Sequence, residues 1–186
     1  MKKVVVITIS GPHGSGKSTY AQAIAKALNL KYVSSGQTFR ELAKEHGCNL
    51  EDFSKKCEND KTIDKEIDQR TINEAKKGNV ILEGQLAAWM ASDKVDIKIY
   101  LTASNNIRFK RIAKREKLLY QEAEQETRDR EESERRRFQE IYDINMMDLS
   151  IYDLVIDTSL LPLDDTITML KNIISNYIQK KNRRKK

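Results

Sequence analysis

Cysteine, proline and histidine are scarce in this sequence of 186 residues, with two of each. Cys48 and Cys57 lack the spacing of metal ligands, and no Cys/His cluster accompanies them, so we expect free thiols in a cytoplasmic protein. No apolar run approaches the length of a membrane span, which argues against membrane association. The short apolar run near Met1 leads directly into a glycine-rich segment, which is unlike a signal peptide.

The net charge of +6 comes from the C-terminus alone. Six basic residues stand from Lys180 to Lys186, and the remaining chain is formally neutral. We expect residues 181–186 to form a basic, disordered tail. Such a tail can contact nucleic acid, but a solvated terminus is the simpler interpretation, and we do not expect a nucleic-acid partner.

A phosphate-binding motif is present in its usual setting. Residues 11–18 read GPHGSGKS and directly follow the apolar run Val4–Ile9. In such a loop, backbone N–H groups surround phosphate oxygens, Lys17 reaches the β- and γ-phosphates, and the Ser18 hydroxyl binds Mg²⁺. The motif therefore predicts an ATP site that consists of Gly11, Pro12, His13, Gly14, Ser15, Gly16, Lys17, Ser18 and Thr19.

Apolar segments of strand length alternate with helical patterns along the chain. This alternation predicts one α/β domain over residues 1–180, with a parallel five-stranded sheet flanked by helices. The last helix is expected from about Asp165 to Lys180, before the basic tail. The expected strands are Val4–Ser10, Lys31–Val33, Val80–Leu82, Ile97–Leu101 and Leu154–Ile156.

A charged segment separates the fourth and fifth expected strands. Residues 124–140 read EQETRDREESERRRFQE, in which twelve of seventeen residues are charged and Phe138 is the single large apolar residue. A helix of this composition has no apolar face to bury in a core, and i,i+4 ion pairs such as Glu126–Arg130 would stabilise it. It is either a solvated helix or a mobile lid whose arginines close over phosphates. Its position opposite the nucleotide loop favours the lid.

Polar residues follow two further strands. Glu83 ends the third strand, and a carboxylate at this place in a phosphate-loop protein faces the Mg²⁺ shell. The alternative is that Glu83 caps the next turn. The second strand leads into YVSSGQTFR, from which Ser35 and Arg40 would face the cleft beside the loop. Arg40 suits a bidentate grip on a phosphate that does not belong to ATP.

Together these segments resemble the archaeal form of the cytidylate kinase family. The resemblance rests on the phosphate loop, YVSSGQTFR, VILEGQLAAW, the arginine-rich segment and DLSIYDLVIDTS, and it extends over residues 4–178. It implies the fold of P-loop nucleoside monophosphate kinases, with an acceptor-binding segment at about 36–78 and a lid at about 115–145. It also implies ATP and Mg²⁺ as cofactors and transfer of the γ-phosphoryl group to CMP and to dCMP, which gives ADP and CDP.

The resemblance assigns roles to single residues. Ser35 and Arg40 correspond to the serine and arginine that hold the acceptor's phosphate. The spacing Arg128-x-x-x-Glu132-x-x-Arg135 corresponds to the group in the lid. In that group, Arg128 and Arg135 act on the reacting phosphates, and Glu132 contributes to holding the acceptor.

Two positions depart from the family pattern. Ser34 stands where the family usually has Asp, and Gln85 stands where it commonly has Arg. The missing arginine weakens the expected grip on the acceptor, to which Gln85 itself would still contribute. Arg70, on the preceding helix, is the residue that would compensate by binding the substrate.

Phosphoryl transfer to a monophosphate needs no dedicated base, so the scarcity of histidine does not argue against an enzyme. The phosphate of the acceptor has a second pKa of about 6 and is largely a dianion at neutral pH. Two alternatives remain. The chain is a kinase for another small acceptor, such as UMP or AMP, or it is an RNA-associated protein that uses ATP as a switch. We expect a monomer.

Overall fold

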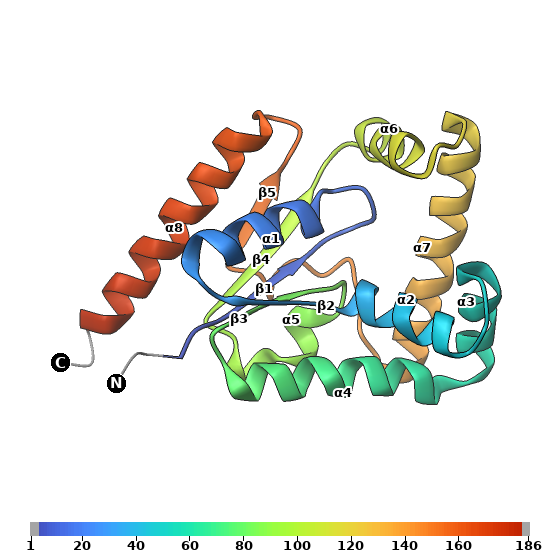
Figure 1. The fold of residues 1–186 in the computed structure, drawn as a ribbon, viewed down its shortest axis with the longest axis horizontal. Helices are drawn as coiled ribbons and strands as arrows, with labels where there is room; N and C mark the ends of the chain where they lie inside the picture. Colours follow the sequence, from blue (N-terminus) through green and yellow to red (C-terminus); the bar gives the residue numbers. More distant parts are fainter. Residues whose placement is uncertain (1–3, 184–186) are drawn as a thin grey trace.

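A parallel sheet of five strands forms the centre of the molecule (Figure 1). The computed structural model describes residues 4–183. The strands lie in the order β2-β3-β1-β4-β5, so the first strand stands in the middle, and the predicted α/β fold is confirmed. The strands are β1 (Val6–Ser10), β2 (Lys31–Ser34), β3 (Val80–Glu83), β4 (Ile97–Thr102) and β5 (Leu154–Asp157).

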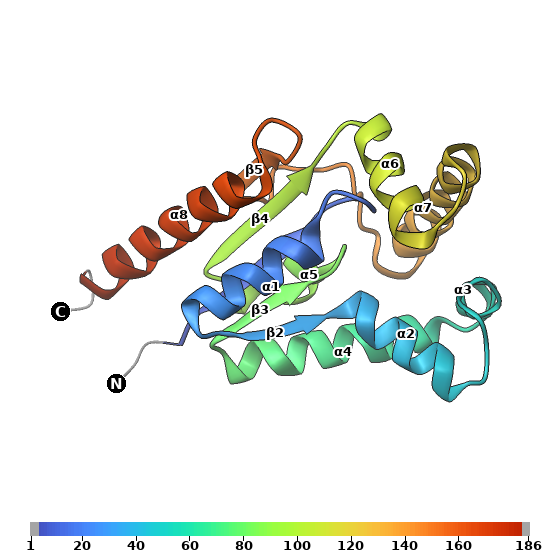
Figure 2. The same ribbon diagram turned by 45° about the horizontal axis from the view of Figure 1, so that its top comes forward.

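Helices cover both faces of this sheet (Figure 2). On one face, Ile24 of α1 and Leu170 of α8 are buried in a core with Ile7 and Ile99. The other face is covered by α4 and α5. Because both faces are covered, every residue of β1 is buried, including the polar residues Thr8 and Ser10. These helices are α1 (Lys17–Leu28), α8 (Leu163–Arg183), α4 (Lys61–Lys77) and α5 (Ala87–Met90).

The other helices lie beyond the carboxyl ends of the strands, on two sides of the sheet (Figure 1). α2 and α3 pack on the end of α4 through a small core that includes Leu42, Phe53 and Ile67. α6 and α7 stand on the opposite side. Ligands of open α/β sheets bind at this edge, so the two groups of helices flank the expected site. Their bounds are α2 (Ser35–Glu45), α3 (Leu50–Asn59), α6 (Asn105–Glu116) and α7 (Tyr120–Tyr142), and a short 3₁₀ turn, η1, covers Ser92–Lys94.

The charged helix α7 buries more of itself than its composition predicts. Glu134 and Arg137 are only 8% and 5% exposed. Each has a partner of opposite charge, since Glu134 binds Arg130 and Arg137 lies against Asp64. Pairing allows charged residues to be buried, which an apolar-stripe criterion does not register. The predicted pair Glu126–Arg130 is absent because Arg130 turns to Glu134 instead.

The C-terminal helix is longer than predicted. α8 begins at Leu163 and continues to Arg183, so the first half of the expected disordered tail is helical. Residues 184–186 of that tail lie outside the described residues. None of the helices within residues 4–183 has the length and apolar character needed to cross a membrane.

Candidate functional site

The phosphate loop connects β1 to α1 in a conformation that glycine adopts most easily. Gly11, Gly14 and Gly16 have φ values of 143°, 77° and 90°. A Cβ atom at Gly11 would lie 2.0 Å from the carbonyl oxygen of Leu101, and one at Gly14 would lie 2.6 Å from that of Arg108. The loop ends at the N-terminus of α1, whose partial positive charge suits a phosphate group.

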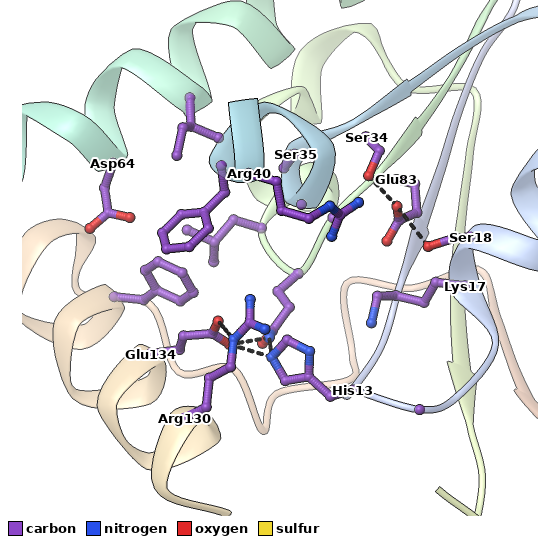
Figure 3. Close-up of a pocket in the computed structure, with 18 of the residues that line it drawn as sticks. His13, Lys17, Ser18, Ser34, Ser35, Arg40, Asp64, Glu83, Arg130 and Glu134 are labelled. Carbon is purple, nitrogen blue, oxygen red and sulfur yellow. Dashed lines mark hydrogen bonds and ion pairs between the residues drawn. The ribbon is translucent and has the colours of Figure 1, made fainter. Parts of the chain in front are cut away.

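A cavity lies at the carboxyl edge of the sheet, between the phosphate loop and the outer helices (Figure 3). Its walls come from the loop, α2, α4, the turn after β3, α6 and α7, so distant parts of the chain meet there. Gly11, Pro12 and Ser15 belong to the loop but do not line the cavity. The predicted site residues that do line it are His13, Gly14, Gly16, Lys17, Ser18, Thr19, Ser35, Arg40, Glu83 and Gln85.

Glu83, at the end of β3, accepts hydrogen bonds from three hydroxyl groups. Its Oε2 accepts hydrogen bonds from Ser18 Oγ at 3.2 Å, Tyr32 Oη at 3.1 Å and Ser34 Oγ at 2.5 Å. Ser34 faces Glu83 because the two residues are partners in the register of β2 and β3. The carboxylate is 5% exposed and is therefore held in one orientation, toward Ser18.

The Ser18 hydroxyl and the Glu83 carboxylate fit the predicted magnesium site. Both are oxygen donors, and Mg²⁺ is usually held by one or two carboxylates together with substrate phosphates. Within residues 4–183, no group of three or more His, Cys, Asp or Glu side chains could hold a metal ion. The described chain therefore offers a partial coordination shell, of the kind that nucleotide phosphates and water complete.

Arg40 and Ser35 reach the cavity from the first turns of α2 (Figure 3). Ser34 caps this helix, since its Oγ accepts a hydrogen bond from the N–H of Gln37 at 3.2 Å. Ser35 Oγ lies 3.2 Å from Thr71 Oγ1, which ties α2 to α4. In the described part of the chain, the Arg40 guanidinium has no hydrogen-bond or ion-pair partner. An unpaired guanidinium at a cavity wall is suited to bind an anion.

Two carboxylates of α7 dock this helix onto the phosphate loop. Glu131 Oε1 accepts a hydrogen bond from the N–H of His13 at 3.0 Å. Glu134 Oε2 lies 2.8 Å from His13 Nε2 and also accepts from the amide of Gln85, while its Oε1 accepts from Arg130 Nε at 2.9 Å. The side chain of His13, which was predicted as part of the ATP site, is thus enclosed between the loop and α7 (Figure 3).

Burial and neighbouring charges shift the ionisation of this cluster. Burial lowers the pKa of His13 and of Lys17, because a charged group loses its hydration there, although nearby carboxylates oppose the shift. Burial alone would raise the pKa of Glu134, but His13 and Arg130 outweigh it and hold that pKa below its ordinary value. Glu134 is therefore ionised at neutral pH, and its charge is compensated by its contacts with His13 and Arg130.

The structure does not bring the predicted lid residues to the cavity. Arg128 and Arg135 form ion pairs within α7 on its exposed surface, and Glu132 is the partner of Arg135. The residues of α7 that face the cavity come two positions later. Two residues rotate an α-helix by about 200°, so the predicted set lies on the opposite side. The residues of α7 that line the cavity are Arg130, Glu134, Arg137 and Phe138.

Arg70 does not reach the cavity either. Its side chain is exposed and pairs with Glu66 on the same helix at 2.7 Å. The positive charge beside Gln85 comes from Arg130, through the shared Glu134 carboxylate.

Several residues that line the cavity were not predicted from the sequence to belong to the site. On α7 they recur at i, i+4 and i+7, and this spacing beside Phe138 is the signal that could have revealed them. On α4, a buried aspartate directly follows a buried isoleucine twice, one turn apart, at Ile63-Asp64 and at Ile67-Asp68. The cavity residues without a predicted role include Asp64, Asp68, Arg130, Glu134 and Arg137.

Comparison with known proteins identifies the family to which this chain belongs. The model of the cytidylate kinase-like family matches residues 6–160. A cytidylate kinase of Staphylothermus marinus is 47% identical, over 95% of this chain and 99% of its own length. One of Methanocaldococcus jannaschii is 46% identical, over 92% and 98%. The crystal structure of a shikimate kinase of Bacteroides thetaiotaomicron is 11% identical, with a TM-score of 0.62 over 93% of this chain and 99% of that one, which shows a shared fold. The chain belongs to the cytidylate kinase-like family.

Proposed function

We propose that this protein transfers the γ-phosphoryl group of ATP to CMP, and also to dCMP, to give ADP and CDP. Relatives named cytidylate kinase match nearly the whole chain at 46–47% identity, which supports this activity. The observation in the site that carries the proposal is that Lys17 of the phosphate loop and the unpaired Arg40 of α2 line one cavity. A donor phosphate at the loop and an acceptor phosphate at Arg40 would meet there.

In this proposal, different helices around the cavity bind the acceptor and close the site. α2, α3 and α4 form the acceptor-binding segment, which agrees in extent with the region 36–78 expected from the sequence. We assign the lid to α7 (Tyr120–Tyr142), which lies within the expected region 115–145, whereas α6 (Asn105–Glu116) precedes almost all of that region.

Catalysis in this site rests on alignment and on neutralisation of charge. The loop and Lys17 hold the β- and γ-phosphates, and Arg40 holds the phosphate of CMP, so that donor and acceptor lie in line. The acceptor phosphate is already largely a dianion, so no residue has to remove a proton. Glu134 holds Arg130 beside the cavity, and the arriving phosphates compete with this carboxylate for the guanidinium. Arg130 then stabilises the charge that develops during transfer.

Ser18 and Glu83 are the residues that would hold Mg²⁺ in the nucleotide complex. The ion supplies positive charge to the phosphate oxygens when bound. The three hydroxyl groups on Glu83 keep its carboxylate turned toward Ser18, which is the contribution of this chain to the metal site.

The acceptor is tested by measuring ADP formation from ATP and Mg²⁺ with CMP, dCMP, UMP, AMP and GMP in turn. We expect CMP to give the highest kcat/KM, with dCMP next. A preference for UMP or AMP, or ADP formation that does not depend on an acceptor, would contradict the proposal. Lys17→Ala protein, prepared in parallel, controls for contaminating kinases because it lacks the main charge at the donor phosphates.

A further inference from the structure

The end of the cavity away from the phosphate loop has an unusual lining. Figure 3 shows Asp64 across the cavity from Lys17 and Ser18. Phe39, Ile67 and Phe138 supply apolar walls at this end, and Arg137 adds a positive charge. An apolar compartment in which an aspartate, Asp64, stands beside a guanidinium does not suit a phosphate alone. It suits a flat, polar-edged ring.

Asp64 and Arg137 form an ion pair that leaves hydrogen-bonding capacity unused. Arg137 Nε lies 2.6 Å from Asp64 Oδ2, and both side chains are almost fully buried. The contact does not have hydrogen-bond geometry, and within residues 4–183 neither Arg137 Nη1 nor Asp64 Oδ2 has a hydrogen-bond partner. Buried donors and acceptors without partners are costly and rare in native proteins, so these two groups are available to a ligand or to water.

A second buried acid joins the same two helices. Asp68 lies one turn after Asp64 on α4 and accepts a hydrogen bond from the hydroxyl of Tyr142, near the end of α7. Burial raises the pKa of Asp64, against the opposing charge of Arg137, and it raises the pKa of Asp68 to about 6. Replacing a buried ion pair with apolar residues is often neutral or stabilising, so stability alone does not account for this arrangement.

The pair matches one edge of cytosine. The 4-amino group of cytosine is a donor that carboxylates accept, and the neighbouring ring nitrogen N3 is an acceptor that a guanidinium can serve. Uracil presents the opposite order, with an acceptor at O4 and a donor at N3. A carboxylate would then face the O4 oxygen, and a guanidinium would face an N–H group, which leaves both protein groups unpaired.

We propose that Asp64 and Arg137 read the base of the acceptor nucleotide, with the Asp64 carboxylate accepting from the 4-amino group and Arg137 Nη1 donating to N3. This inference rests on the proposed function, because it places the acceptor's phosphate at Arg40 and its base toward α4. The pair separates CMP from UMP. It does not by itself separate CMP from AMP, whose amino group and N1 repeat the same order.

The reading site also links base recognition to the lid. Asp64 belongs to α4 and Arg137 to α7, so the two groups stand together only while these helices lie against each other. Three further contacts join α7 to the acceptor side of the cavity, from Asp68 to Tyr142, from Lys61 to Glu140 and from Glu58 to Ser133. A base that satisfies both groups therefore holds α7 in place over the site.

The first test compares kcat/KM for CMP and UMP in wild type and in Asp64→Asn. The amide can rotate to donate to O4, so we expect the preference for CMP over UMP to fall by about 10- to 100-fold. Asp60→Asn is the matched control. Asp60 is a partly exposed acid at the start of the same helix, and asparagine preserves its role as N-cap. Its CMP/UMP ratio should equal that of wild type. A purely structural role of Asp64 would lower both activities together and leave the ratio unchanged.

The second test needs no variant and therefore does not depend on folding of Asp64→Asn. Wild type is assayed with the CMP analogue that has hydrogen in place of the 4-amino group. We expect kcat/KM to fall by about 10- to 100-fold relative to CMP. An analogue as good as CMP, or a folded Asp64→Asn protein with an unchanged CMP/UMP ratio, would overturn the base-reading role while leaving the kinase activity established. Wild type that phosphorylates no nucleoside monophosphate would overturn the proposed function and this inference with it.

Discussion

Replacing Arg130 with alanine is expected to lower kcat by about 10- to 30-fold, with smaller effects on the binding of ATP or CMP alone. The guanidinium donates to Glu134 at 2.9 Å beside the phosphate loop, and its side chain lines the cavity. A charge-assisted hydrogen bond contributes about 1.5–3 kcal/mol. Because the Arg130 side chain is 40% exposed, water screens part of this effect, and we take the lower part of that range.

The same experiment decides which face of α7 acts. Arg128 lies on the far side of the helix, paired with Glu124 at 2.7 Å on the surface. An exposed i,i+4 pair contributes about 0.3–0.5 kcal/mol to stability, so Arg128→Ala should change kcat by less than about threefold. Arg136 is exposed, lies 4.0 Å from Glu132 and does not line the cavity, so it provides a control for the loss of a surface arginine from α7.

The assay is ADP release at saturating ATP, Mg²⁺ and CMP, with the melting temperature of each variant measured to confirm folding. Arg130→Ala should lose turnover while Arg136→Ala retains it. If Arg128→Ala lost as much as Arg130→Ala, the functional face of α7 would be the one predicted from the sequence. The docked arrangement around Glu134 would then not represent the catalytic alignment.

Four further outcomes follow from the same contacts. Lys17→Ala should lower kcat by at least about 100-fold without loss of folding, because its Nζ donates only to the Pro12 carbonyl within the described chain; activity within a few-fold of wild type would remove Lys17 from the donor site. Arg40→Ala should raise the KM for CMP by about 10- to 100-fold and change the KM for ATP far less, and equal effects on both would place Arg40 elsewhere. Asp68 has a pKa of about 6 in the folded state against an ordinary 3.8, so between these values the folded state binds more protons than the unfolded state and loses stability as the pH rises. The free energy of unfolding in urea should therefore be higher in Asp68→Asn than in wild type by at most about 3 kcal/mol at pH 7.5, and equal to it below pH 4. An equal change at both pH values would contradict this. Proteolysis within residues 120–145 should slow when a bisubstrate analogue binds, and unchanged cleavage would mean that this segment does not close.

The local parts of the site could be predicted from the sequence, and the parts made by long-range contacts could not. The phosphate loop can be recognised from the spacing of its glycines and from the apolar strand that precedes it. Glu83 was found because a buried strand ends there. In both cases the chemistry depends on neighbours in sequence and on the known edge of a parallel sheet.

The face of α7 depends on contacts that sequence spacing does not reveal. A helix in which most residues are charged has no apolar stripe to set its rotation, so any of several arginine sets could face the cavity. The rotation is set by distant partners, since Glu131 binds Arg108 and Arg137 lies against Asp64. The resemblance to a family pattern selected Arg128 and Arg135 instead, on the opposite side.

The most direct test of the central claim follows the phosphate itself. Wild-type protein is incubated with CMP, Mg²⁺ and ATP labelled in the γ-phosphoryl group, and the products are separated. We expect the label to appear in the β-phosphate of CDP and only when CMP is present. We expect no labelled CDP from Lys17→Ala protein. Label released as inorganic phosphate at a rate independent of CMP would contradict the assignment of this cavity as a site of transfer between two nucleotides.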